Sequence, residues 1–300
     1  MLTRLLKLLG IVVGVLLGLV VVAGIAIFAL SEGQLGKTYD VPAAKLAIPI
    51  PTDADSIARG KLIATTLGDC TTCHGKDFAG GKVAVDPALG EFNSANLTPG
   101  QGGVGASYSA EDFVRVLRYG VKKNGRSVLV MPSAEFAHMD DADLGAVVAF
   151  LKSLPPTDKQ LPPANLTFLG RALLVVGQVP PPAASILPVG APRPADVPHQ
   201  LGADYGKYLA SVGCGGCHNA PSYTGGKIAG VPPDWPSAPN LTAAGELSVW
   251  TEADFITAMH TGKTPTGRQL RAEYMAYSLY GKLPDAELKS IYTYLKSLPK

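Results

Sequence analysis

The most apolar part of the chain lies at its N-terminus. Residues 8–30 form an uncharged apolar run of 23 residues, and the only charges before it are Arg4 and Lys7. A helix needs roughly 20 apolar residues to cross a bilayer, whereas the apolar core of a cleaved signal peptide has about 7 to 15. The run therefore predicts an uncleaved membrane anchor over residues 1–31, with cleavage near residues 29–31 as the alternative.

The two early charges also predict the topology. Because Arg4 and Lys7 precede the apolar run, the positive-inside bias places Ser31 and everything after it outside the cytoplasm. We expect a single-pass protein of the cytoplasmic membrane with its folded part on the periplasmic, extracytoplasmic side. Residues 32–52 are expected to be a tether.

The polar and apolar pattern after the tether occurs twice, at an offset of 144 residues. The offset carries Asn96-Leu97-Thr98 onto Asn240-Leu241-Thr242, and it carries the helical pattern that ends in LKSLP at residue 155 onto the one that ends at residue 299. The sequence thus predicts two tandem copies of one all-α domain, over residues 53–156 and 200–300.

The segment between the copies, residues 157–199, is predicted to be a proline-rich linker. Residues 155–199 hold 11 of the 25 prolines, which favours a semi-rigid connector. Within it, NLTFLGRALLVVGQV is apolar enough for a short helix. We expect this helix to pack against the folded domains, with an interfacial helix on the membrane as the alternative.

A glycine recurs inside the first predicted helix of each copy, as Gly60 and Gly206. Glycine costs about 1 kcal/mol relative to alanine in a helix, so its recurrence predicts a close crossing of two helices. Phe150 and Tyr294 on the last helix of each copy are the candidate partners.

The four cysteines of the chain occur in two matching motifs. GDCTTCHGK contains Cys70, Cys73 and His74, and GCGGCHNA contains Cys214, Cys217 and His218. Exported cysteines would normally predict two disulfides. A histidine directly after each pair favours the attachment pattern of c-type haem instead, in which two thiols form thioethers and the imidazole reaches the iron. We therefore predict two covalently bound haem c groups, with His74 and His218 as iron ligands.

The repeat also selects the sixth ligand of each iron. The downstream candidates are Met131, His138 and Met139 in the first copy and Met259, His260 and Met275 in the second. Only Met131 and Met275 lie at the same distance, 57 residues, after His74 and His218. The sequence predicts His/Met ligation of both haems, which raises the potential in cytochromes c.

Other recurring polar residues are candidates for the haem propionates. Asn96 and Asn240, together with Arg126 and Arg268, recur in both copies and could form charge-assisted hydrogen bonds. The alternative is that each asparagine forms a turn and each arginine lies on a solvated loop. Arg118, which aligns with His260, is expected at the surface or at a propionate edge.

Both copies resemble class I cytochrome c domains. The run NLTPGQGGVGASYSAEDFVRVLRYG, followed by NGRSVLVMPSAEF and LKSLPP, resembles the haem domains in cytochrome subunits of bacterial membrane-bound alcohol and gluconate dehydrogenases. The resemblance implies an all-helical domain around each haem. It also implies electron transfer from an extracytoplasmic dehydrogenase towards quinone or a terminal oxidase. Those subunits usually hold three haems, whereas this chain has two motifs, and Met275 is followed by Ala276 where proline is usual.

The charge of the chain and the spacing of its cysteines disfavour two other classes of function. The net charge is +2 and the basic residues are scattered, so nucleic acid is not expected as a partner. A zinc or dithiol protein is disfavoured because the cysteine pairs lie 144 residues apart. We predict an electron-transfer protein with no catalytic residue. The alternatives are a peroxidase-like dihaem enzyme, which would need Met275 to be displaced, and a dihaem subunit of a haem-copper oxidase.

Overall fold

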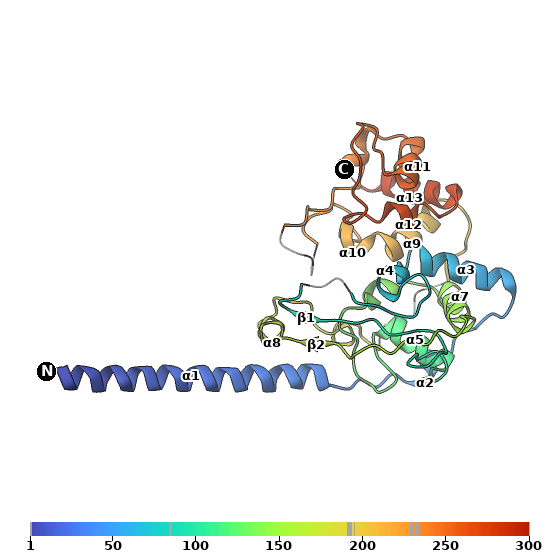
Figure 1. Cartoon of the computed structure of the whole chain (residues 1–300). Coiled ribbons are helices and arrows are strands. Elements are labelled where there is room, and N and C mark those ends of the chain that lie inside the picture. The colour runs from blue at the N-terminus through green and yellow to red at the C-terminus, as the bar shows by residue number, and fades with distance from the viewer. Residues whose placement is uncertain are drawn as a thin grey trace.

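The computed structural model describes residues 2–83, 86–190, 194, 196–228, 231 and 234–299. Helix α1 (Leu2–Gly36) projects as a long rod from a mostly helical body, as Figure 1 shows. The only sheet within the described residues pairs two short antiparallel strands, β1 (Gly90–Glu91) and β2 (Asn165–Leu166). The all-α prediction is confirmed.

Helix α1 is long and apolar enough to cross a membrane, and the most apolar part of it is not buried against the rest of the protein. Large side chains such as Leu16 and Val20 are exposed along it. The helix continues to Gly36, past the predicted end of the anchor at residue 31. Its exposed apolar surface is what a lipid-facing helix requires.

Residues 32–52 do not form a free tether. Val41 and Leu46, the latter on α2 (Ala43–Leu46), are buried, and the N–H of Tyr39 donates a hydrogen bond to the carbonyl of Gly125 at 2.9 Å. The segment therefore holds the end of α1 against the first copy of the repeat.

The two copies have matching helices. Repeat 1 contains α3 (Ala54–Thr65), α4 (Cys70–His74), α5 (Ala110–Tyr119), α6 (Ser133–Phe136) and α7 (Asp141–Lys152). Repeat 2 contains α9 (Ala203–Gly213), α10 (Gly215–His218), the 3-10 turn η2 (Glu246–Val249), α11 (Glu252–Thr261), α12 (Tyr277–Tyr280) and α13 (Asp285–Ser297). Repeat 2 is stacked on the side of repeat 1 that faces away from α1 (Figure 1).

Helix starts follow local side-chain chemistry. Ser109 with Asp112 and Thr251 with Asp254 form reciprocal capping boxes at the starts of α5 and α11. The carboxylate of Asp140 accepts the Asp143 N–H at 2.8 Å and caps α7. Pro284 is the residue immediately before α13.

The linker packs along repeat 1. It contains β2, α8 (Phe168–Val175) and the 3-10 turn η1 (Ala183–Ser185). The N–H of Thr167 donates to the Leu89 carbonyl at 3.0 Å, and the N–H of Ala184 donates to the Ser127 hydroxyl at 2.9 Å. The expected packing of the short apolar helix against a folded domain is confirmed, and α8 also contacts α1.

The two helical glycines lie at close helix crossings, as predicted. A Cβ atom on Gly60 would overlap the carbonyl group of Ala146, and one on Gly206 would overlap that of Ser290. The partner of each glycine is therefore backbone of α7 or α13 and not an aromatic ring. The rings proposed from the sequence pack elsewhere, Phe150 on Phe78 and Tyr294 on Tyr223.

Gly60→Ala and Gly206→Ala are expected to destabilise their repeats. Overpacking typically costs about 1–3 kcal/mol, and a clash with backbone cannot be relieved by rotating a side chain. We expect thermal unfolding of the haem-loaded protein to shift down by at least about 5 °C for each variant. Gly190→Ala is the matched control, because no atom of the described residues lies within 4 Å of its Cβ position. Equal melting temperatures for the three variants would contradict the crossing.

Candidate haem sites

Each Cys-x-x-Cys-His motif forms a short helix in the same place in its repeat. Helix α4 begins at Cys70 and ends at His74, and α10 ends at His218. All four cysteine thiols are free, so the disulfide alternative does not apply. Cys70 and Cys214 pack against the hydrophobic core.

The two motif histidines have matching hydrogen bonds. Nδ1 of His74 lies 2.8 Å from the Ala95 carbonyl, and Nδ1 of His218 lies 3.1 Å from the Pro239 carbonyl. A carbonyl can only accept, so Nδ1 carries the proton and Nε2 keeps the lone pair that a metal ligand needs. Burial lowers the pKa of both imidazoles against the opposing effect of these bonds. Both rings are thus neutral and oriented, which fits an iron ligand.

The cysteine environments disfavour thiolate chemistry. Burial, with smaller effects from Asp69 and Cys73, raises the pKa of Cys70 to about 12. Burial, with a smaller effect from Cys217, raises the pKa of Cys214 to about 12. A redox dithiol depends on a thiolate, which these surroundings oppose. In each motif, a cysteine packed against the core and an oriented imidazole fit covalent haem attachment.

The predicted methionine ligands lie on equivalent loops. Each loop starts at a left-handed glycine after α5 or α11, and the N–H of Ser133 or Tyr277 donates to the carbonyl of Met131 (2.9 Å) or Met275 (2.7 Å). Both methionines are partly buried against the core. Met131 leads into α6 and Met275 into α12, so the structure puts the two thioethers in corresponding positions.

The rejected ligand candidates have other surroundings. Met139 and Met259 are buried in the core, and His138 is exposed. His260 pairs with Asp285, with Nε2 2.7 Å from the carboxylate. These surroundings agree with the prediction that Met131 and Met275, and not these four residues, are the sixth ligands.

The asparagine candidates for the propionates hold turns. Nδ2 of Asn96 donates to the carbonyls of Thr157 (2.8 Å) and Lys159 (3.3 Å), and its Oδ1 accepts from the N–H and hydroxyl of Thr98. Oδ1 of Asn240 accepts the Thr242 N–H at 2.8 Å in the same turn. These contacts favour the turn alternative, and the propionate role stays a prediction that they do not support.

The arginine candidates differ from one another. Arg126 is exposed, and Arg268 pairs with Glu246. The expectation of a surface position for Arg118 is wrong. Arg118 is buried, and its guanidinium bonds to Asp141 at 2.5 Å and to the Met139 carbonyl at 2.8 Å. It joins α5 to the first turn of α7, as His260 joins α11 to α13.

Comparison with known proteins agrees with this geometry. The family model described as Cytochrome c matches residues 57–155 and 203–299. The chain belongs to the cytochrome c family. The two matches, one for each repeat, mean that it carries two covalently bound haem c groups, and that electron transfer is the function of its domains.

Several relatives of this cytochrome c are known. It is 32% identical to the fructose dehydrogenase cytochrome subunit of Gluconobacter japonicus, over 84% of this chain and 54% of that protein. It is 30% identical to the cytochrome c subunit of the alcohol dehydrogenase (quinone) of Gluconobacter oxydans, over 82% of this chain and 56% of that protein. A diheme cytochrome c-type protein of Cereibacter sphaeroides is 27% identical, over 77% of this chain and 82% of that protein. The chain spans about half the length of the first two.

The second haem attachment motif packs against repeat 1 close to the first motif. A Cβ atom on Gly213, next to Cys214, would lie 2.6 Å from Leu67 of repeat 1 and 3.4 Å from Tyr280. A Cβ atom on Gly216, within the second motif, would lie 2.5 Å from the carboxylate of Glu135. The sequence pattern did not indicate this contact, because an internal repeat gives no information on how its two copies pack against each other.

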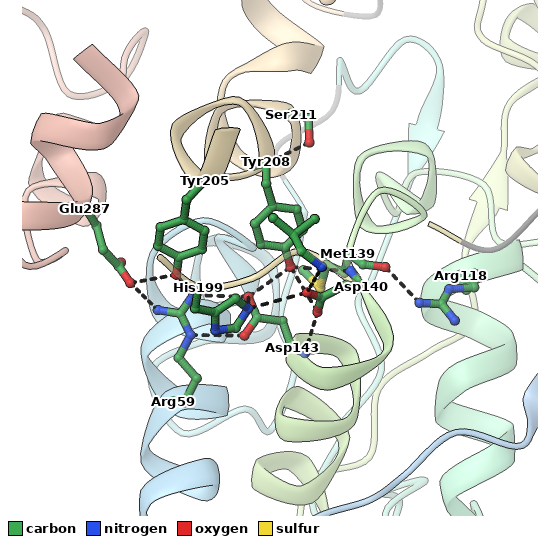
Figure 2. Close-up of polar contacts among 11 residues, drawn as sticks. Arg59, Arg118, Met139, Asp140, Asp143, His199, Tyr205, Tyr208, Ser211 and Glu287 are labelled. Carbon is green, nitrogen blue, oxygen red and sulfur yellow. Dashed lines mark hydrogen bonds and ion pairs between the residues drawn. The ribbon is translucent and has the colours of Figure 1, made fainter. Parts of the chain in front are cut away.

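A polar cluster holds the repeats in this arrangement, as Figure 2 shows. The interdomain cluster consists of Arg59, Asp140, Asp143, His199, Tyr205, Tyr208 and Glu287. Repeat 1 contributes the arginine and the two aspartates, and repeat 2 contributes the tyrosines and the glutamate. His199 comes from the end of the linker.

Arg59 is the centre of the cluster. Its guanidinium binds both oxygens of Asp143 (3.0 and 3.1 Å), Glu287 (2.6 Å) and the hydroxyl of Tyr205 (2.8 Å). Burial alone would lower the pKa of Arg59, but the Asp143 hydrogen bond and the two carboxylate charges raise it. The hydroxyl of Tyr208 also donates to Asp143 at 2.9 Å. One cation therefore binds a carboxylate from each repeat.

His199 makes the interdomain cluster sensitive to pH. A hydrogen bond to Asp140 (3.4 Å) raises the pKa of His199, with help from the charges of Asp143 and Asp140 and against burial and Arg59. A pKa that is higher in the folded than in the unfolded protein stabilises most below about pH 6.5. The stabilisation is lost as the pH rises through the folded value.

We expect the melting temperature of the protein to decline between about pH 6 and 8, and we expect His199→Gln to flatten that decline. Melting curves across this range test it, with His138→Gln as the control at an exposed histidine. If both variants kept the wild-type slope, His199 would not be the group that titrates.

Proposed function

We propose that this protein is a membrane-tethered dihaem cytochrome c that takes electrons from an extracytoplasmic dehydrogenase and passes them singly to a quinone-linked acceptor or oxidase of the respiratory chain. The observation that carries the proposal is the duplicated ligand geometry. His74 and His218 each present Nε2 because a carbonyl 21 residues downstream accepts from Nδ1. Two such sites in one chain suit a relay of single electrons.

The residues have the following proposed roles. Cys70 and Cys73 would hold one haem through thioethers, and Cys214 and Cys217 would hold the other. Bound haem supplies a one-electron couple, whose potential depends on the iron ligands, burial and nearby charge. His74 with Met131 would bind one iron, and His218 with Met275 would bind the other.

The protein's own residues would orient the iron ligands and limit their movement during electron transfer. Backbone carbonyls orient the imidazoles, and the core packs against Cys70, Cys214 and the two methionines, which limits reorganisation when the charge changes. No acid, base or nucleophile is required. The second motif packs against repeat 1 close to the first motif, which supports transfer within one chain.

The names of the relatives support a dehydrogenase as the donor. Fructose, alcohol and gluconate dehydrogenases each have a cytochrome subunit similar to this chain, which favours a dehydrogenase over a haem-copper oxidase as the partner. Helix α1 would hold the protein in the cytoplasmic membrane, with both haem domains on the periplasmic side.

Native membranes can test the proposal. Membranes with and without this chain would be given alcohols, sugars and sugar acids in turn, while haem c absorbance and oxygen uptake are recorded. We expect at least one substrate to reduce the haems, and we expect the coupled oxygen uptake to disappear without the chain. If no substrate reduced the haems, while the reduced protein consumed peroxide catalytically, the enzyme alternative would replace the relay.

A further inference from the structure

Helix α8 lies beside the outer part of α1, as Figure 1 shows. The ring of Phe168 lies 3.9 Å from the Cβ position of Gly24. The guanidinium of Arg171 lies 4.7 Å from the ring centre of Phe28 and bonds to Glu32 at 2.6 Å. Residues further along α8 therefore contact residues further along α1. Phe168 lies at the level of Gly24, and Arg171 lies close to the end of the apolar run.

These contacts define the position of α8 along the axis of the apolar run of α1. Gly24 lies six residues before Leu30, where the run ends. At 1.5 Å per residue this is about 9 Å along the helix axis. If the run occupies the hydrocarbon region, Phe168 lies below its outer edge and not in the water above it.

The side chains of α8 are divided between two faces. Leu174 is buried, and a Cβ atom on Gly170 would overlap the Leu89 carbonyl, so one face packs on repeat 1. Phe168 and Leu169 point away from the core and are 56% and 49% exposed. Two adjacent large apolar side chains thus extend the bare apolar surface of α1 sideways.

We propose that the N-terminal end of α8 is inserted into the outer leaflet of the bilayer, with the side chains of Phe168 and Leu169 among the acyl chains. The proposal rests on membrane anchoring by α1. Phospholipid is the molecule that would contact the exposed face of α8, because this face is continuous with the surface that α1 would offer to lipid. Arg171 then lies at the headgroup level, where a long cationic side chain keeps its charge near phosphate and water.

The insertion would add a second contact to a single anchoring helix. The contact joins α1, α8 and the strand pair that connects the linker to repeat 1, so the first haem domain would rest on the membrane. Repeat 2 lies beside repeat 1, displaced sideways from the axis of α1 (Figure 1).

Photo-crosslinking of the full-length, haem-loaded protein in phospholipid vesicles tests the proposal. A photo-reactive phenylalanine analogue would replace Phe168, and lipid adducts would be measured by mass spectrometry. Val249, which is 77% exposed on repeat 2, is the matched control for an apolar residue away from α1. Leu16, in the middle of the apolar run, reports on anchoring itself.

We expect lipid adducts at positions 16 and 168, with those at 249 at least about tenfold fewer. Adducts at 16 but not at 168 would overturn the insertion and leave the anchor intact. Crosslinks from 168 to a second protein chain would overturn it as well, since α8 would then be a protein contact. No adduct at 16 would remove the anchoring on which the proposal depends.

Discussion

Replacing Met131 with leucine is expected to open the sixth position of one haem and leave the other filled. Leucine nearly matches methionine in volume, so the fold should survive, but it has no thioether to bind iron. We expect the reduced variant to bind carbon monoxide at one haem of the two. We also expect the potential of that haem to fall by more than about 0.1 V, because axial ligands set haem potentials over a range of about 0.8 V. Carbon monoxide difference spectra and a redox titration measure both effects.

Two further variants make this result specific. Met275→Leu should act on the other haem, so the double variant should bind carbon monoxide at both. Met139→Leu is the control, because Met139 is buried in the core eight residues from Met131 and is not a proposed ligand. If Met131→Leu behaved like Met139→Leu in both measurements, the assignment of Met131 would be wrong.

Replacing Arg59 with methionine is expected to give the largest loss of stability among single changes at the contact between the repeats. The change leaves Asp143, whose side chain is 2% exposed, and Glu287, at 11%, without their shared cation. Removing one partner of a buried ion pair typically costs about 3–5 kcal/mol. For a unit of this size, that corresponds to roughly 10 °C in melting temperature. Calorimetry of the haem-loaded protein measures the shift.

Lys289→Met provides the comparison for a surface pair. Lys289 lies 3.2 Å from Glu252, and both side chains are exposed, so its loss should cost less than about 1 kcal/mol. We expect the repeats of the Arg59→Met protein to move apart, which small-angle scattering would detect as a larger radius of gyration. Equal effects of the two substitutions would show that Arg59 does not hold the repeats together.

The sequence predicts the architecture well because the chain is a repeat. Each motif residue has a counterpart at a fixed offset, so Met131 could be chosen over Met139 with no structure in hand. The helical glycines were predicted to mark crossings for a similar reason, since a residue that costs stability twice needs a packing explanation. Only the partner was misjudged, because a pattern of apolar residues identifies a helix face but not which backbone atom approaches it.

The relation between the repeats could not be predicted in this way. Arg59, Asp143 and Glu287 look like ordinary surface charges in the sequence, since helical periodicity does not distinguish a solvated face from one that meets another domain. Arg118 was misplaced because its buried contacts with Asp141 and the Met139 carbonyl, within its own repeat, leave no mark on the apolar pattern. The linker gave a partial signal, because its prolines indicate stiffness but not the surface that it follows.

The carbon monoxide response of the unmodified protein shows whether both irons have a sixth ligand. The full-length chain would be matured with two haems, reduced, and its absorption spectrum recorded before and after addition of the gas. The account predicts two low-spin haems whose spectra do not change, because a histidine and a methionine fill the axial positions of each iron. Rapid binding at either haem would contradict it, and would make the chain a candidate for chemistry on small molecules instead of a relay for electrons.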